Sequence, residues 1–225
     1  MQINPGANLL LKGVTGSRAF GLNHENSDYD YQGIFVAPTH AFLGLASKAQ
    51  ESFNYKNPDT TYHEVGKFCR LALNCNPTVL DLLWLEVYNV RTEFGIELIN
   101  LRNNFLSASR VKGAYFGYAN DQYAKLLKDD RFEKRAKNAR HFARLLYQGR
   151  VLYRTGQLEV KLPNPYAFIE FGESVANGDL DRAKSALSYA EEAFKEPSAL
   201  PEEPNKEVIN EWLLKVRYEL FKNGY

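Results

Sequence analysis

TGSRAFG at residues 15–21 and SDYDYQGIFV at residues 27–36 decide the predicted fold of this chain. Residues 8–14, which precede them, are mostly apolar and predict a short strand that ends at Thr15-Gly16. Ser17 suits the N-cap of a helical turn over the residues that follow it. Aromatic and β-branched residues then predict a second strand over 28–36. The predicted order is therefore strand, Gly-Ser turn, helix, loop and acidic strand.

Asp28 and Asp30 are the residues best suited to bind a metal ion. Side chains alternate along a strand, so both carboxylates point to one face, roughly 6 to 7 Å apart. Two unpaired carboxylates at this distance repel each other and raise one pKa, unless a cation lies between them. Mg²⁺ prefers oxygen ligands and commonly binds one or two carboxylates together with phosphate oxygens. The pair therefore predicts a site for Mg²⁺ or Mn²⁺ beside a phosphate-containing ligand.

The Gly-Ser turn supplies candidate ligands for that phosphate. A glycine allows close approach of the backbone, and free N–H groups at the start of a helix favour anions. Gly16, Ser17 and Arg18 are accordingly the candidates for binding a triphosphate. Each motif alone has a simpler interpretation, because Gly-Ser is common in turns and Asp-x-Asp often begins a strand or a turn. Their conjunction, with these flanking elements, indicates a nucleotide site.

These stretches resemble the signature of the DNA polymerase beta-like nucleotidyltransferase superfamily. More narrowly, the chain is similar to predicted nucleotidyltransferases associated with RNA repair in bacteria and phages. The narrower similarity continues in KFCRLAL (67–73), NCNPTVLDLLW (74–84), FGYANDQ (116–122) and HFARLL (141–146), and it covers about residues 9–163.

The resemblance implies an enzyme that transfers a nucleoside monophosphate from ATP or another NTP to an acceptor hydroxyl. An RNA 3′ end is the expected acceptor, pyrophosphate the leaving group, and two Mg²⁺ or Mn²⁺ ions the cofactors. Two other functions stay open. One is a non-catalytic nucleotide- or RNA-binding module that acts with an RNA-repair partner enzyme, and the other is a protein-nucleotidylating enzyme of the toxin-antitoxin kind.

Members of the superfamily place a third carboxylate on a neighbouring strand, and here the resemblance points to Asp59, with Glu64 as the alternative. A strand over residues 59–63 would put Asp59 on one face and Glu64 on the opposite one. Residues 57–60, Asn-Pro-Asp-Thr, also suit a turn that caps the following helix. Catalytic and metal-binding roles are therefore predicted for Asp28, Asp30 and Asp59.

A basic stretch lies between residues 125 and 154, although the net charge of the whole chain is only +1. Apolar residues at helical spacing predict a helix over 130–153. Lys137, His141 and Arg144 form a second stripe along it. Such a stripe is often a solvated basic face. The resemblance implies instead that these three residues bind the nucleotide or its triphosphate.

The predicted fold class is α+β, with a small mixed twisted sheet, flanking helices and a helical C-terminal region. Residues 1–105 form the expected nucleotidyltransferase core, and residues 106–225 a helical domain that contributes to the substrate cleft. Helical spacing predicts helices over 67–73, 79–87, 94–101, 109–127, 130–153, 180–194 and 205–221.

Composition is consistent with this organisation. A chain of 225 residues, 44% of them hydrophobic, can bury a substantial core. No apolar run approaches the roughly 20 residues that a membrane-spanning helix needs, and no signal segment is recognisable, so a cytoplasmic location is expected. Cys69 and Cys75, the only cysteines, support neither a disulfide framework nor a zinc site.

Overall fold

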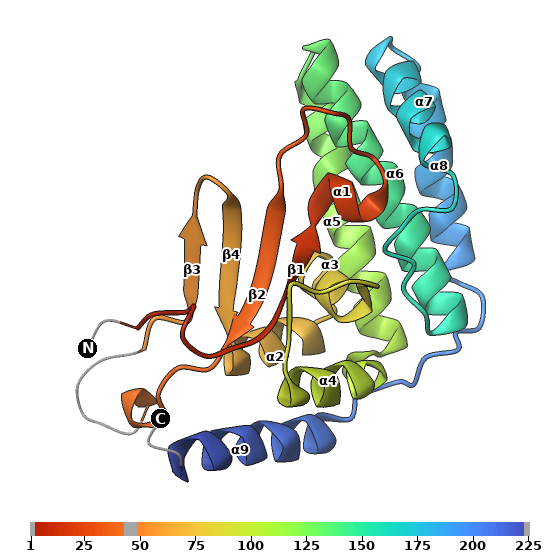
Figure 1. Ribbon diagram of the computed structural model, residues 1–225. Coiled ribbons are helices and arrows are strands. Elements are labelled where there is room, and N and C mark those ends of the chain that lie inside the picture. Colours follow the sequence, from red (N-terminus) through yellow and green to blue (C-terminus); the bar gives the residue numbers. More distant parts are fainter. Residues whose placement is uncertain (1–2, 43–48, 223–225) are drawn as a thin grey trace.

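The computed structural model describes residues 3–42 and 49–222, and within them a five-stranded mixed sheet packs against helices (Figure 1). The strands lie in the order β3 (Ser52–Tyr55), β4 (Asp59–Glu64), β2 (Asp30–Phe35), β1 (Leu9–Thr15) and β5 (Val90–Arg91). Strand β2 runs parallel to β4, whereas the other neighbours are antiparallel. The predicted α+β fold class is confirmed.

The first helices are short and lie between the strands or just after the last one. They are α1 (Gly16–Phe20), α2 (Val65–Leu73), α3 (Pro77–Leu80) and α4 (Glu93–Asn100), with 3-10 turns η1 (Thr39–Phe42), η2 (Asp81–Trp84) and η3 (Arg102–Phe105). The later helices are α5 (Ala108–Lys128), α6 (Phe132–Thr155), α7 (Pro165–Ala176), α8 (Leu180–Ala193) and α9 (Lys206–Lys222). Helix α6 contacts α5, α7 and α8, while α9 returns to α2, η1 and η3 near the sheet (Figure 1).

The start of α1 and the start of β2 both differ from the prediction. Helix α1 begins at Gly16, whose φ of 69° turns the chain directly out of β1, so that Thr15 occupies the N-cap position. The prediction of Ser17 as N-cap is therefore wrong. Strand β2 begins at Asp30, because its partners end there: Asp30 pairs with Thr15 of β1 and with Asp59 of β4. Asp28 lies in the loop just before the strand.

Two helix predictions also need correction. The helix expected over 79–87 begins at Pro77, which stands at its first position, and gives way to η2, which ends at Trp84. It stops there because the chain turns to add β5 to the sheet, where Asn89 N donates to Lys12 O. Helix α7 was not predicted, although Pro165 at its start is a typical initiation signal.

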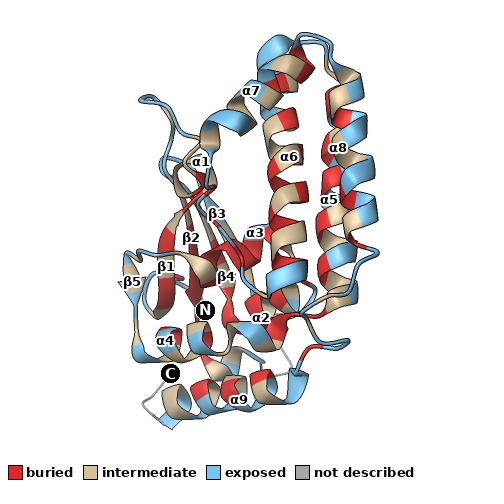
Figure 2. Ribbon diagram, turned by 90° about the vertical axis from the view of Figure 1, so that its right-hand side faces the viewer, coloured by how far each residue is buried: buried red, intermediate tan, exposed pale blue. Residues whose placement is uncertain are grey.

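One buried apolar cluster connects the sheet to the helices. It includes Leu11 of β1, Tyr115 of α5, Phe142 of α6 and Val216 of α9. Buried residues recur along α5, α6 and α9 (Figure 2). The division of the chain at residue 105 stays a prediction. Within the described residues, no helix has both the length and the apolar character needed to cross a membrane.

Candidate active site

A cavity of about 680 Å³ lies between the ends of β2 and β4, the α1 turn, the α3–η2 segment and α6. Its volume is in the range of small-molecule sites. The predicted site residues that line it come from distant parts of the sequence: Gly16, Ser17, Asp28, Asp30, Asp59, Lys137, His141 and Arg144. Tertiary packing therefore brings eight of the nine predicted residues to one cavity.

Gly16 fits the turn for two reasons. Its φ of 69° is a conformation that other L-residues rarely adopt. A Cβ at this position would also overlap the Oδ2 atom of Asp30. The absence of a side chain at Gly16 therefore lets the Asp30 carboxylate lie directly against the turn. The Gly-Ser turn and the acidic strand form one structural unit.

Asp28, Asp30 and Asp59 all line the cavity, Asp30 and Asp59 from the sheet and Asp28 from the loop before β2. Asp30 and Asp59 are paired residues at the starts of two parallel strands. Burial raises the pKa of Asp30, the charge of Asp59 raises it further, Lys137 opposes this increase, and Asp28 adds a smaller one. The acids thus share an excess of negative charge that Lys137 on α6 offsets only in part.

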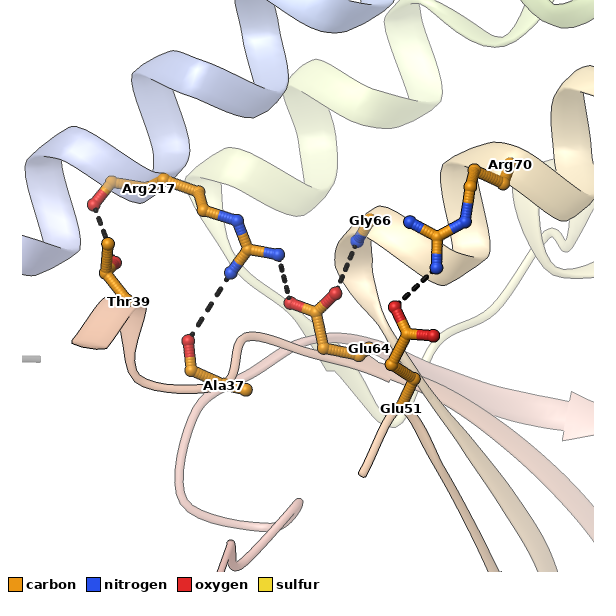
Figure 3. A network of polar contacts seen from close by, with 7 residues as sticks. All are labelled: Ala37, Thr39, Glu51, Glu64, Gly66, Arg70 and Arg217. Atoms are coloured by element: carbon orange, nitrogen blue, oxygen red, sulfur yellow. Dashed lines mark hydrogen bonds and ion pairs between the residues drawn. The ribbon is translucent and has the colours of Figure 1, made fainter. Parts of the chain in front are cut away.

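Glu64, the alternative to Asp59, lies at the other end of β4 and is fully buried. Its Oε2 accepts a hydrogen bond from Gly66 N at 2.8 Å, and its Oε1 pairs with Arg217 Nη2 at 2.7 Å (Figure 3). Arg217 also donates to Ala37 O at 3.5 Å. Glu64 therefore caps α2 and anchors α9, whereas Asp59 is the acid that reaches the cavity.

Arg18 is placed differently from the prediction. Its side chain is not among those lining the cavity. Its Nη2 donates to Ser27 O at 2.6 Å, its Nε lies 3.3 Å from Asp28 O, and its guanidinium stacks on the Tyr29 ring at 3.9 Å. In this structure Arg18 thus holds the loop that carries Asp28, instead of facing a phosphate.

The stripe predicted on α6 faces the cavity, but its members differ in character. Lys137 is exposed to solvent. Burial, followed by the charges of Arg144, Lys125 and Lys137, lowers the pKa of His141 to about 3, so this imidazole is neutral at pH 7. Lys137 is therefore the member best suited to attract a phosphate, while His141 can contribute a neutral hydrogen bond.

Arg144 is buried, with 4% of its surface exposed, and it already has partners. Its Nη1 donates to Gln148 Oε1 at 2.6 Å and lies 3.6 Å from Asp81 Oδ2. The guanidinium also stacks on the Phe20 ring of α1 at 3.9 Å. These contacts connect α6 to both α1 and η2, so Arg144 helps to fix the shape of the cavity.

Asp81 is a cavity residue that sequence reasoning missed. It is 2% exposed, and burial raises its pKa to about 7 in spite of the opposing charge of Arg144. The available signal was a single acid inside the apolar run VLDLLW at residues 79–84. Acids are almost never fully buried without a partner, so such a position deserves notice.

Residues 2–168 match the model of the RNA repair pathway DNA polymerase beta family. The chain belongs to this family. A search of curated proteins finds no match. Among solved structures, the chain is similar to a nucleotidyltransferase-like protein from Exiguobacterium sibiricum, at 11% sequence identity and a TM-score of 0.33 over 95% of this chain and 75% of that one. Membership in the RNA repair pathway DNA polymerase beta family confirms the predicted resemblance and supports a transferase.

Nucleotidyltransferases in general use an NTP and divalent metal ions. In residues 3–42 and 49–222, no three Asp, Glu, His or Cys side chains are gathered closely enough to form a metal site. The chemistry of the donors nevertheless fits a hard cation, because carboxylate oxygens are what Mg²⁺ prefers. Burial raises the pKa of Asp30 most, and the negative charges of Asp59 and Asp28 raise it further. A bound cation would neutralise that charge.

Proposed function

We propose that this protein transfers a nucleoside monophosphate from an NTP to an acceptor hydroxyl and releases pyrophosphate. One observation carries the proposal. The paired starts of β2 and β4 present Asp30 and Asp59 to the same cavity as the Gly16 turn, opposite Lys137. This cavity suits a triphosphate and its metal ions, because acids, the N–H groups of a turn and the positive side chain of Lys137 surround it.

Each part of the cavity has a role in this proposal. Asp28 and Asp30 would hold metal ions together with Asp59, and the Ser17 hydroxyl and the neighbouring N–H groups would bind the β and γ phosphates. Lys137 would neutralise phosphate charge. Bound Mg²⁺ or Mn²⁺ would stabilise the entering and leaving oxygens and lower the pKa of the attacking hydroxyl.

The proposed reaction is an in-line displacement. The acceptor oxygen forms a bond to the α-phosphorus as the bond from phosphorus to the pyrophosphate oxygen breaks. The carboxylate of Asp59 accepts the proton of the acceptor hydroxyl, a role that contributes about 100-fold or more in rate. The remaining residues act by positioning the NTP and by neutralising charge.

An RNA 3′ end is the proposed acceptor. The family name refers to an RNA repair pathway, which is the support for this choice. The basic side chains of Lys137 and Arg140 line the cavity and would suit the backbone of an incoming strand. A partner enzyme of RNA repair, which would supply or use the modified end, belongs to the same proposal.

A second candidate is a nucleotide-binding protein that does not catalyse transfer. The observation that favours it is that the described carboxylates are not gathered into a ready-made metal site. In this case the cavity would bind an NTP and leave the chemistry to a partner.

Transfer can be tested with each NTP labelled on its α phosphate, in the presence of Mg²⁺ or Mn²⁺. RNA with a free 3′ hydroxyl, the same RNA with a blocked 3′ end, and cell lysate are the acceptors. The proposal predicts label on the free-ended RNA only, and loss of this label in Asp28→Ala/Asp30→Ala. Asp121→Asn, an exposed acid on α5, is the matched control.

The other outcomes assign other functions. Label on protein in the lysate would indicate protein nucleotidylation. NTP binding without transfer to any acceptor would indicate the binding module. If the double variant transferred label as well as the natural protein, the proposed role of the acids would be wrong.

A further inference from the structure

Asp81 is a buried acid on the wall of the cavity. It has no role in the proposed transfer reaction. It begins η2, three residues after Thr78, which lines the same wall. Only 2% of its surface is exposed. Burying a carboxylate without hydrogen-bond or ion-pair partners costs free energy. The polar contacts of Asp81 therefore show whether it is still able to bind a ligand.

The protein satisfies only one side of this carboxylate. Oδ2 lies 3.6 Å from Arg144 Nη1, and the same nitrogen makes its short hydrogen bond of 2.6 Å to Gln148 instead. Oδ1 is buried and has no hydrogen-bond partner among the described residues. An unsatisfied buried acceptor costs about 1 to 3 kcal/mol, so a ligand that brought a donor to Oδ1 would recover this energy.

The charge of Asp81 indicates which part of a nucleotide it would meet. A phosphate would be repelled by the ionised carboxylate, whereas a hydroxyl or an N–H group can donate a hydrogen bond to a carboxyl oxygen in either protonation state. The Arg144 guanidinium beside Asp81 stacks on Phe20, and Phe20 and Leu22 both line the cavity. Apolar groups next to a few polar ones are typical of the surroundings of a base and its ribose.

We propose that Asp81 is a specificity-determining residue, whose Oδ1 accepts a hydrogen bond from the nucleoside part of the bound NTP. The donor is a neutral group, either a hydroxyl of the ribose or an N–H of the base. This inference rests on the proposed function, since it assumes that the cavity binds an NTP. It adds that the α3–η2 wall selects the nucleotide and that the acids on β2 and β4 do not.

Equilibrium binding with Mg²⁺ and without acceptor tests this inference independently of catalysis. The dissociation constants of the four NTPs are measured by calorimetry, and then those of analogues that lack one donor of the preferred NTP. The 2′-deoxy and 3′-deoxy analogues test the ribose, and a base analogue without its exocyclic amine or ring N–H tests the base. The natural protein should lose about 10- to 100-fold in affinity for one of these analogues.

Asp81→Asn is the decisive variant. Arg144 would hold the amide oxygen at the position of Oδ2, so the amide NH₂ would take the place of Oδ1. This NH₂ would then face the hydroxyl or N–H group of the nucleoside, and two donors cannot form a hydrogen bond. The variant should therefore bind the preferred NTP about 10-fold more weakly and distinguish it from that analogue by less than twofold. Ser107→Ala is the matched control, because it removes a different buried polar group, one that does not line the cavity.

Two results would overturn the inference: equal affinity of the natural protein for the preferred NTP and all analogues, or unchanged discrimination in a folded Asp81→Asn. If that variant does not fold, Asp81→Leu/Arg144→Met removes the buried pair as a unit and must also lose the discrimination. A natural protein that binds no NTP would refute both proposals. Discrimination by Asp81 without any transfer would refute only the proposed function.

Discussion

Asp59 and Glu64 are acids at the two ends of one strand, and the structure places them in opposite surroundings. Asp59 is exposed, begins β4 and lines the cavity. Glu64 is fully buried, ends β4 and is paired with Arg217 of α9. Their side chains project from opposite faces of the strand, as the alternation of β4 predicts.

The difference shows that the neighbours of a carboxylate determine whether it can bind a ligand or is already paired within the fold. Glu64 has a counter-ion and a backbone donor, so its charge is already compensated and is unavailable to a ligand. The negative charge of Asp59 repels that of Asp30, and a cation bound beside them would reduce this repulsion. Four substitutions test how the surroundings of these side chains determine their roles, and the expected effects decrease from Glu64→Ala to His141→Gln.

Glu64→Ala is expected to have the largest effect, on stability. It leaves Arg217, whose side chain is only 17% exposed, without its counter-ion, and breaking a buried pair costs about 3 to 5 kcal/mol. Chemical denaturation measures the change. Glu51→Ala, which breaks the exposed pair with Arg70, is the matched control and should cost at most about 1 kcal/mol. Equal losses in the two variants would contradict a structural role for Glu64.

Asp59→Asn should have the converse effect, on catalysis. Transfer of label to RNA is expected to fall by about 100-fold or more, which corresponds to about 2.7 kcal/mol. The free energy of unfolding should change by less than about 0.5 kcal/mol, because the side chain is exposed. Single-turnover kinetics and denaturation of the same preparation measure both quantities. Retention of full transfer activity would remove Asp59 from the mechanism.

Arg18→Lys tests whether the acidic loop is held by Arg18. Lysine keeps the charge but cannot reproduce the contacts of the guanidinium with the carbonyls of Ser27 and Asp28. We expect transfer to fall about tenfold, or about 1.4 kcal/mol, while the dissociation constant of the NTP changes less than twofold. A large change in NTP affinity instead would support the prediction that Arg18 binds the triphosphate.

His141→Gln should have the smallest effect, confined to acidic pH. The folded protein holds the pKa of His141 at about 3, below the ordinary 6.5, so the unfolded chain binds the proton first. The stability from the neutral imidazole is therefore present above pH 6.5 and is lost as pH falls toward 3. Between pH 7 and 5.5 the natural protein should lose about 1 kcal/mol more than the variant.

Denaturation midpoints at the two pH values measure this difference. His24→Gln, at an exposed histidine of the loop before Asp28, is the matched control. A pH dependence of His141→Gln equal to that of the natural protein would show that His141 is not held neutral in the fold.

The candidate site was predictable to the extent that its signals are local. Gly16 and the closely spaced acids Asp28 and Asp30 are read from neighbouring residues. The alternation predicted for the two acids does not hold, because β2 begins at Asp30 and Asp28 lies in the loop before it. The stripe of Lys137, His141 and Arg144 follows from helical spacing, and all three do face the cavity. Arg18 and Asp81 could not be placed in this way, because their surroundings depend on loop packing and on a helix 63 residues further along the chain.

The order of the first strand, the glycine turn and the acidic strand, and the positions of most helices, follow from local sequence signals. These depend on side-chain periodicity and on turn chemistry, which act over a few residues. Three other features depend on tertiary packing: Asp59 lines the cavity, Glu64 is paired with Arg217, and Asp81 is buried beside Arg144. The reason is that burial and ion pairing are set by segments distant in the chain, and a carboxylate's charge acts on whatever the fold brings next to it.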